Sequence, residues 1–263
     1  EQRYLPNQVS KTKAIILSAS RGAELGELTE NIPKAMVRIG DKPLLEHVVG
    51  SYGASGVTAI NVVRGYCKQE VSLKGINYID NDEYATTGEL YSLQLALDAI
   101  ETANDDLVVS YGDVMFRRYI LDALLETETD FVISVDAGWQ NSVNRERSAD
   151  FVTCSMPNSR QAFYTNVHLR RMAEDIAPQM THGEWIGMLK VQSAAVPRLV
   201  DAVRSIMDKA DGSGRTAKMF DLFNELVARG ERIRVLYTTG HWLDVDSVQD
   251  VVAASQFEQP IGV

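Results

Sequence analysis

Apolar positions along the chain fall into short runs that alternate with segments of helical spacing. The runs have the length and the β-branched content of buried strands, and the segments between them repeat apolar residues every three or four positions. Strands that alternate with helices predict a parallel sheet with right-handed crossovers over residues 14–136. The predicted strands are 14–17, 58–63, 107–110 and 131–135, with a weaker one at 76–79, and the predicted helices are 43–52, 90–100 and 118–126, with a short one at 69–73.

The pattern is less regular beyond residue 136, where the first strands are expected to pair antiparallel. A flexible Asp-Gly-Ser-Gly turn at 211–214 is expected to join two helices. Residues 240–246 are expected to open the final helix. The predicted strands of this part are 150–156, 161–169, 184–191 and 233–237, and the predicted helices are 194–209 and 217–229.

The chain breaks into small and polar residues directly after the first apolar run, where residues 18–22 read Ser-Ala-Ser-Arg-Gly. A strand that ends in such a loop exposes backbone N–H groups at the carboxyl edge of a parallel sheet, where open α/β sheets bind nucleotides. Arg21 and Lys34 add two cations, which suit an anionic polyphosphate. The alternative interpretation is an ordinary strand-to-helix loop with surface cations.

A carboxylate follows another apolar run. Gly112 and Asp113 come just after the strand predicted at 107–110, so the carboxylate is expected over the same edge of the sheet. Mg²⁺ is usually held by one or two carboxylates together with phosphates and water. The sequence therefore predicts a magnesium ligand at Asp113 and a second carboxylate from elsewhere in the chain.

Residues 14–45 resemble the signature of the nucleotidyltransferases that make NDP-sugars and CDP-alcohols. Arg21 and the Pro33-Lys34 pair match that signature, whereas Ser-Ala-Ser at 18–20 replaces the usual glycines and one glycine remains after them. The resemblance implies an α/β fold of the Rossmann-like nucleotidyltransferase (GT-A-like) type. Its sheet is expected to be mixed, mainly parallel and flanked by helices.

Residues 81–93 sharpen the resemblance. Their pattern Asn-x-x-Tyr-x-x-Thr-x-x-x-x-Ser-Leu is similar to phosphocholine cytidylyltransferases. It is closer still to the phosphonate cytidylyltransferases, modules of phosphonate biosynthesis that are in some cases fused to phosphoenolpyruvate phosphomutase. The stretches LSASRG, SYGDVMF and GEWIGMLKV support this second match. It implies CTP as the donor and a small phosphonate as the acceptor, with 2-aminoethylphosphonate first and 2-hydroxyethylphosphonate second.

The resemblance also assigns roles to single residues. LDVDSVQDV near the C-terminus resembles the Asp-rich ending of cytidylyltransferases, which makes Asp246 the second magnesium ligand and Asp244 the fallback. The alternative is that these residues, or Ser247, are helix N-caps. Lys34 is expected on the α-phosphate and Arg21 on the leaving phosphates. The implied nucleotide-binding residues are Leu17, Ser18, Ala19, Ser20, Gly22, Thr87, Gly88, Glu89, Ser92 and Gly112.

The acceptor is expected against the later half of the chain. Lys190 is the candidate ligand of the phosphonate, and Glu184 or Asp136 the candidate partner of an ammonium group. Trp185 fits a core position as well as it fits a cage around the ammonium. Glu89 likewise has an alternative role, as a first-turn acid that complements the helix dipole.

The expected reaction needs charge neutralisation more than it needs a general base. A phosphonate or phosphate monoester is anionic at neutral pH, so its oxygen can attack the α-phosphorus of CTP without first losing a proton. This agrees with the four histidines, which occur in no catalytic pattern. Two alternatives stay open: a phosphocholine or sugar-1-phosphate nucleotidyltransferase, and a nucleotide-sensing module without catalysis.

Composition restricts the partners. A net charge of −10 argues against nucleic acid or an anionic membrane as the main partner. Cys67 and Cys154 are isolated, which favours neither a disulfide framework nor a zinc site. Arg145 and Arg147 lie in a polar loop, where we expect them to be solvated.

We expect residues 13–263 to form a single nucleotidyltransferase domain, with a nucleotide-binding half at 13–136 and an acceptor-binding half at 137–263. Residues 1–12 are polar and include a proline, as is typical of a linker or an N-terminal tail. No signal peptide or long apolar segment is visible, so a cytoplasmic location is expected. Fusion to another phosphonate-pathway enzyme and a homodimer are left open by the sequence.

Overall fold

The computed structural model describes residues 12–141 and 149–257 of the chain. The expected linker lies outside the described residues except for Thr12, which opens the first strand. Arg145 and Arg147 also lie outside them.

The first half of the chain builds a parallel sheet around β1 (Thr12–Ser18). This strand lies between β4 (Ala59–Arg64) and β6 (Asp106–Tyr111), and β5 (Asn77–Asp80) extends the sheet beyond β4. All three pairings are parallel, as the alternation of strands and helices predicts. The carboxyl ends of β1 and β6 therefore meet at one edge.

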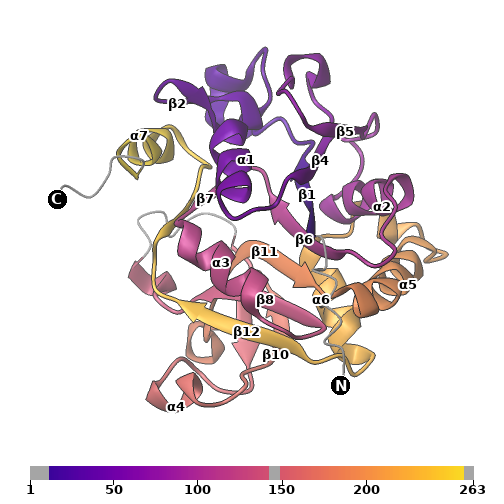
Figure 1. Ribbon diagram of the computed structural model, residues 1–263, viewed down its shortest axis with the longest axis vertical. Helices are drawn as coiled ribbons and strands as arrows, with labels where there is room; N and C mark the ends of the chain where they lie inside the picture. Colours follow the sequence, from indigo (N-terminus) through magenta and orange to yellow (C-terminus); the bar gives the residue numbers. More distant parts are fainter. Residues whose placement is uncertain (1–11, 142–148, 258–263) are drawn as a thin grey trace, which may run out of the picture.

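Helices cover the sheet on both faces, which explains why its strands are continuous apolar runs. Ile15 and Leu17 of β1 face a core shared with α2 (Glu89–Ala99), α5 (Val196–Met207) and α6 (Met219–Ala228). The alternate residues Ala14 and Ile16 face α1 (Leu44–Ala54) and α3 (Arg118–Glu126). Figure 1 shows α2, α5 and α6 gathered on one side of the molecule.

The later half makes the sheet mixed. Strand β11 (Gly183–Val191), buried at all nine positions, pairs antiparallel with both β6 and β8 (Phe131–Asp136). Strands β6 and β8 therefore point the same way, and β12 (Ile233–Thr238) pairs parallel with β8. The prediction of a parallel sheet through residue 136 needs one correction, because β11 separates β8 from β6. The predicted fold class, a mixed and mainly parallel sheet flanked by helices, is confirmed.

The edge of this half also differs from the prediction. Strands β9 (Phe151–Cys154) and β10 (Leu169–Ala173) pair antiparallel, but residues 161–169 are not one strand. A short helix, α4 (Arg160–Phe163), begins there because the Ser159 hydroxyl accepts a hydrogen bond from the Ala162 N–H at 3.1 Å.

Residues 240–246 do not open the final helix. They contain β13 (Trp242–Asp244), which pairs antiparallel with β7 (Val114–Phe116), and α7 (Val248–Phe257) begins only afterwards. The turn predicted at 211–214 runs into a 3₁₀ helix, η7 (Ser213–Thr216). The remaining short elements are η1 (Ala23–Thr29), η2 (Lys34–Met36), β2 (Arg38–Ile39), β3 (Lys42–Pro43), η3 (Lys68–Glu70), η4 (Trp139–Asn141), η5 (Pro178–Met180) and η6 (Ser193–Ala195).

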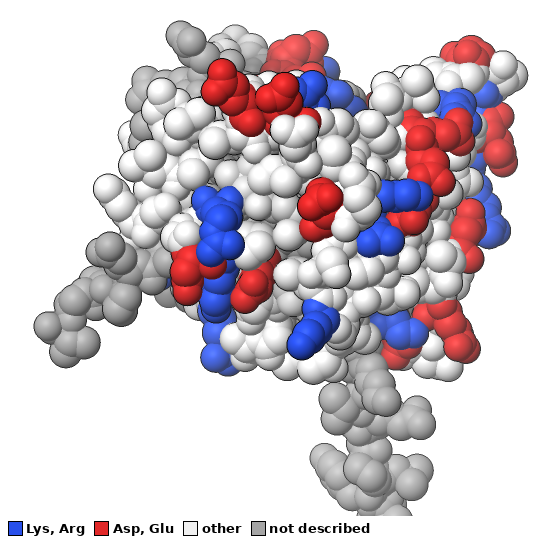
Figure 2. All heavy atoms as spheres, turned by 90° about the horizontal axis from the view of Figure 1, so that it is seen from above, with Lys and Arg blue, Asp and Glu red and all other residues white. Residues whose placement is uncertain are grey.

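Charged groups of both signs are interspersed on the face seen in Figure 2, with uncharged surface between them. In the part of the chain that the structure describes, no helix is long and apolar enough to cross a membrane.

Candidate active site

Three aspartates that are distant in sequence meet beyond the end of β6. Asp113 follows that strand, and the pairing of β7 with β13 brings Asp244 opposite Val114. The Val245 N–H donates to the Asp113 carbonyl at 3.1 Å and continues the contact. One carboxylate oxygen each from Asp113, Asp244 and Asp246 lies within 4.8 Å of the others. We call these three residues the acid triad; it contains both Asp246 and its fallback.

The helix-capping role is filled by Ser247 together with Asp250. Ser247 Oγ accepts a hydrogen bond from the Asp250 N–H at 3.2 Å, and Asp250 Oδ2 accepts from the Ser247 N–H at 2.8 Å. This reciprocal pair forms a capping box before α7. Ser247, one of the candidate N-caps, therefore caps α7.

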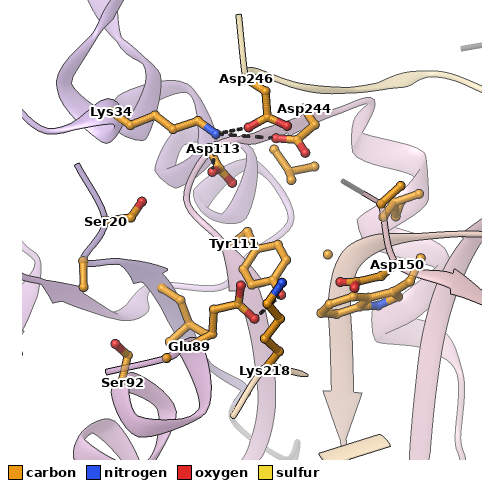
Figure 3. A pocket seen from close by; sticks show the side chains of 18 of the residues that line it. Ser20, Lys34, Glu89, Ser92, Tyr111, Asp113, Asp150, Lys218, Asp244 and Asp246 are labelled. Atoms are coloured by element: carbon orange, nitrogen blue, oxygen red, sulfur yellow. Dashed lines mark hydrogen bonds and ion pairs between the residues drawn. The ribbon is translucent and has the colours of Figure 1, made fainter. Parts of the chain in front are cut away.

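Lys34 is the countercharge of the acid triad (Figure 3). Its Nζ lies 2.8 Å from Asp113 Oδ2 and 3.9 Å from Asp244 Oδ1, and it also contacts Asp246. The residue is only 4% exposed. Burial alone lowers the pKa of the Lys34 ammonium, but the three aspartates outweigh it and raise the pKa above its usual value. Lys34 is therefore a permanent cation at neutral pH.

The loop after β1 is folded tightly around the Lys34 side chain. Gly22 has a φ of +71°, and a Cβ there would lie 2.6 Å from Lys34 Cβ. The Lys34 N–H donates to the Arg21 carbonyl at 3.1 Å, which ties the end of the loop to its start. The surviving glycine thus serves both the turn and the packing of the lysine stem.

Arg21 lies at the surface, outside the pocket lining. Its Nε donates to the Thr29 carbonyl at 3.2 Å, and its guanidinium lies 5.6 Å from the centre of the Tyr66 ring. The structure thus places the two predicted cations differently: Lys34 is held within the acid triad and Arg21 on the loop surface.

Of the residues predicted to bind the nucleotide, some line the pocket and others lie behind its lining. Ser18, Gly22 and Gly112 do not line the pocket; a Cβ on Gly112 would lie 1.8 Å from Ser18 Oγ, so these two residues pack against each other. The predicted residues that do line it are Leu17, Ala19, Ser20, Thr87, Gly88, Glu89 and Ser92.

A polar network fixes the start of α2. Asn81 Nδ2 donates to Thr87 Oγ1 at 3.1 Å and to Ser92 Oγ at 3.0 Å. The N-cap of α2 is Gly88, so neither Thr86 nor Thr87 caps this helix. The threonine hydroxyls instead interact with the segment before the helix.

Glu89 connects the two halves of the chain. Its Oε2 accepts hydrogen bonds from the Tyr111 hydroxyl at 2.8 Å and from the Met219 N–H at 3.1 Å. Met219 is the first residue of α6, so the carboxylate reaches the N-terminus of that helix rather than only its own. Burial raises the pKa of Glu89 despite these hydrogen bonds.

The segment 213–218 docks on the same helix start. The Gly88 N–H donates to the Arg215 carbonyl at 2.7 Å, and the Leu90 N–H donates to the Ala217 carbonyl at 3.2 Å. A Cβ on Gly88 would lie 2.3 Å from the Ala217 oxygen. The predicted flexible turn therefore continues into a segment held by backbone contacts that only a glycine at position 88 permits.

These elements surround one pocket of about 890 Å³, which the acid triad and the start of α2 both line. Such a volume falls in the range of ligand pockets that accept a nucleotide-sized molecule. The four histidines, all within the described part of the chain, are absent from its lining.

Comparison with known sequences identifies the family of the chain. The family model of the MobA-like NTP transferase domain matches residues 14–177, which include the β1 loop, Lys34 and Asp113. The chain belongs to this family. Its partial relatives carry more specific names, and the predicted resemblance to cytidylyltransferases of phosphonates and of phosphocholine is confirmed.

Two of these relatives and one solved structure illustrate the relationship. Choline-phosphate cytidylyltransferase of Streptococcus pneumoniae (strain ATCC BAA-255 / R6) is 38% identical over 110 residues, 40% of this chain and 47% of the relative. 2-Aminoethylphosphonate cytidylyltransferase of Lancefieldella rimae is 30% identical over 114 residues, 40% of this chain and 46% of the relative. Each match thus spans about half the length of the relative. The structure of CTP:phosphocholine cytidylyltransferase (LicC) from Streptococcus pneumoniae has a TM-score of 0.65 at 23% identity, covering 95% of this chain and 100% of the other, which shows a shared fold.

In this NTP transferase chain the residues predicted for the acceptor are only partly brought together: Glu184 pairs with Asp136 across β11 and β8, but of the four only Glu184 and Trp185 line the pocket. Glu184 and Trp185 line the pocket, but both are almost fully buried, and the indole N–H of Trp185 donates to the Met188 carbonyl at 2.8 Å. Asp136 lies outside the lining, where its Oδ2 accepts from the Trp242 indole N–H at 2.8 Å. Trp185 therefore has a core role, and Asp136 positions the chain before β13.

Lys190 is also outside the pocket lining. Its buried Nζ donates to the carbonyls of Leu125 and Thr127 at 2.8 and 2.9 Å, and lies 3.6 Å from Asp106. A lysine with these partners stabilises the end of α3 and has no free donor directed to a substrate. The position of Lys190 does not agree with the predicted binding of a phosphonate.

Other pocket residues were not predicted. Asp150, Glu174, Thr216 and Lys218 line the pocket from the later half of the chain. No motif in the sequence distinguishes them, because each is a single polar residue beside a strand or helix boundary. The docking of segment 213–218 places Thr216 and Lys218 here, the pairing of β9 with β11 places Asp150, and the pairing of β10 with β9 places Glu174.

Proposed function

We propose that this protein is a magnesium-dependent cytidylyltransferase that transfers CMP from CTP to a small phosphonate and releases pyrophosphate. The observation that carries the proposal is the buried Lys34 ammonium within the acid triad, in a pocket that the β1 loop also lines. Together they provide cationic and metal-binding groups at the carboxyl edge of the sheet.

The acid triad fits the metal. Three carboxylate oxygens within 4.8 Å of one another are donors of the type that Mg²⁺ takes from proteins. Asp113 and Asp246 would hold the ion, with Asp244 beside them. When bound there, the ion supplies neutralisation of phosphate charge.

The residues of the chain perform the remaining tasks. Ser20 and the backbone of the β1 loop bind the phosphates, and the start of α2 with Ser92 binds the base and ribose. Lys34 neutralises charge on the α-phosphate, and Arg21 acts on the leaving phosphates from the loop surface. Glu89 holds α2 and α6 together, so we assign it a positioning role within the nucleotide site.

The reaction needs no proton acceptor. An anionic phosphonate oxygen attacks the α-phosphorus, the bond between that phosphorus and the bridging oxygen to the β-phosphate breaks, and pyrophosphate leaves in line. Histidine-free lining agrees with this chemistry.

We place 2-aminoethylphosphonate first among the acceptors and 2-hydroxyethylphosphonate second. The resemblance of residues 81–93 and the relative named for 2-aminoethylphosphonate support this order. The relative named choline-phosphate cytidylyltransferase favours phosphocholine as the second candidate class. A cytoplasmic location accompanies the proposal, and fusion and homodimer formation stay predictions from the sequence.

The test is pyrophosphate release with four nucleoside triphosphates against the two phosphonates, phosphocholine and glucose 1-phosphate, with and without Mg²⁺. We expect release that requires CTP, a phosphonate and the ion. Activity confined to hexose 1-phosphates would refute the proposal, and CTP binding without release from any acceptor would establish a sensing module.

A further inference from the structure

Two residues of opposite charge from the later half of the chain, Lys218 and Asp150, line the pocket in addition to the acid triad. Lys218 precedes α6 and Asp150 precedes β9, and Figure 3 shows both side chains below and to the right of Lys34. Neither residue has a part in the nucleotide and metal roles described above.

Lys218 is suited to an anion. Among the described residues, the only cations that line the pocket are Lys34 and Lys218, and Lys34 is held within the acid triad. The Lys218 backbone is fixed, because its N–H donates to Asp221 Oδ2 at 2.8 Å. Its side chain stays 45% exposed and pairs with Glu174 at 2.6 Å. The ammonium is therefore accessible and placed by a rigid backbone.

Asp150 is suited to a cation. Its carbonyl accepts from the Trp185 N–H at 2.8 Å, which fixes its backbone beside β11, whereas its carboxylate makes no hydrogen bond or ion pair within residues 12–141 and 149–257. Burial, followed by the negative charges of Glu89 and Glu174, raises the pKa of Asp150 to about 7. A positive group beside this carboxylate would relieve an unfavourable charge.

The charge of the whole pocket points the same way. Eight carboxylates and two lysines line it, so an acceptor that carries only negative charge is repelled more than one that also carries a positive charge. The acidic residues are Glu24, Glu89, Asp113, Asp150, Glu174, Glu184, Asp244 and Asp246.

We propose that Lys218 and Asp150 bind the two charges of a zwitterionic acceptor, Lys218 the phosphonate and Asp150 the ammonium. The inference rests on the proposed function and assigns the choice between amino and hydroxy tails to Asp150. The ammonium takes no part in the reaction: the phosphonate oxygen forms the new bond to the α-phosphorus, and pyrophosphate leaves. Lys218 replaces Lys190 as the acceptor-binding lysine.

The experiment measures kcat and KM for 2-aminoethylphosphonate, 2-hydroxyethylphosphonate and ethylphosphonate at saturating CTP and Mg²⁺. For Asp150→Asn we expect KM for the amino acceptor to rise about tenfold or more, as is typical for the loss of a charged hydrogen-bond partner. The KM values of the two acceptors without an ammonium should change less than about threefold, because they lack the group that Asp150 binds.

Lys218→Met should raise KM for all three phosphonates by similar factors, and Lys218→Arg should restore much of the loss. Asp175→Asn and Lys209→Met, at exposed positions, are matched controls. An unchanged KM for CTP in each variant shows that the fold and the nucleotide site are intact.

Equal effects of Asp150→Asn on all three acceptors, or no effect on any, would overturn the inference while leaving the proposed function in place. Absence of CTP-dependent pyrophosphate release from every phosphonate in the unchanged protein would instead refute the proposed function.

Discussion

The two ends of the pocket hold their charges differently. At the acid triad, the Lys34 ammonium lies among carboxylates that compensate it, and it is almost completely buried. At the other end, the side chain of Lys218 is 45% exposed, and burial with nearby carboxylates disfavours the negative charge of Asp150 and raises its pKa to about 7. The first end is an ion-pair group that is stable without substrate. The second end gains from the charges of a ligand, which is where selectivity among acceptors is expected.

The largest effect is expected at the acid triad. Asp113→Asn should leave the protein folded and lower turnover about a thousandfold or more, because it removes a metal ligand and part of the Lys34 countercharge. Steady-state pyrophosphate release measures it, with Asp122→Asn on the exposed side of α3 as the control. Turnover close to that of the unchanged protein would contradict the metal assignment.

Lys34→Ala should lower kcat about a hundredfold, since loss of a transition-state cation typically costs on the order of 3 kcal/mol. A change confined to KM would argue against a transition-state role. The same variant also tests the ion pairs between Lys34 and the acid triad by a measurement that does not depend on turnover. Removing the ammonium leaves the triad uncompensated, so Mg²⁺ should raise the melting temperature of the variant more than that of the unchanged protein.

Gly88→Ala tests the contact between the start of α2 and segment 213–218, which connects the two ends of the pocket. The added methyl group would meet the Ala217 oxygen and displace segment 213–218, which carries Thr216 and leads into Lys218. We expect a loss of about 2 kcal/mol in the free energy of unfolding by urea. Gly53→Ala is the control, because its Cβ would meet nothing within 4 Å inside α1. Equal stability of the two variants would show that the segment does not depend on this contact.

The smallest effect concerns stability and pH. Because the pKa of Asp150 is raised from 3.8 to about 7, the folded state binds its proton more tightly than the unfolded state. The free energy of unfolding should therefore fall as the pH rises from about 4 to about 7. The carboxylate faces Glu89, Glu174 and Glu184, with Lys218 as the opposing charge.

Asp150→Asn removes this dependence. The variant should be more stable than the unchanged protein at pH 8 by about 1–2 kcal/mol, after allowance for solvent screening, and the difference should vanish near pH 4. Urea unfolding at several pH values measures it. A variant less stable at pH 8 would mean that Asp150 contributes favourably to folding, and that its charge is already compensated.

The sequence alone determined the parallel part of the sheet and the edge at which its strands end. Buried parallel strands are apolar on both faces, so their runs were visible, and a parallel sheet necessarily gathers their carboxyl ends at one edge. The β1 loop and Asp113 could be placed together for that reason, and Lys34 was identified by a local motif. The nearness of Asp246 to Asp113 came from family resemblance, not from any pattern that predicted β13.

Only the tertiary structure decided the rest. An apolar run predicts a buried strand but not the strand that pairs with it. The position of β11 between β6 and β8 and the pairing of β13 with β7 were therefore not predictable from periodicity. The sequence likewise does not distinguish a lysine whose ammonium donates to backbone carbonyls, such as Lys190, from one whose side chain lines a pocket, such as Lys218. Side-chain roles at the acceptor end depend on long-range contacts, and these exist only once the chain has folded.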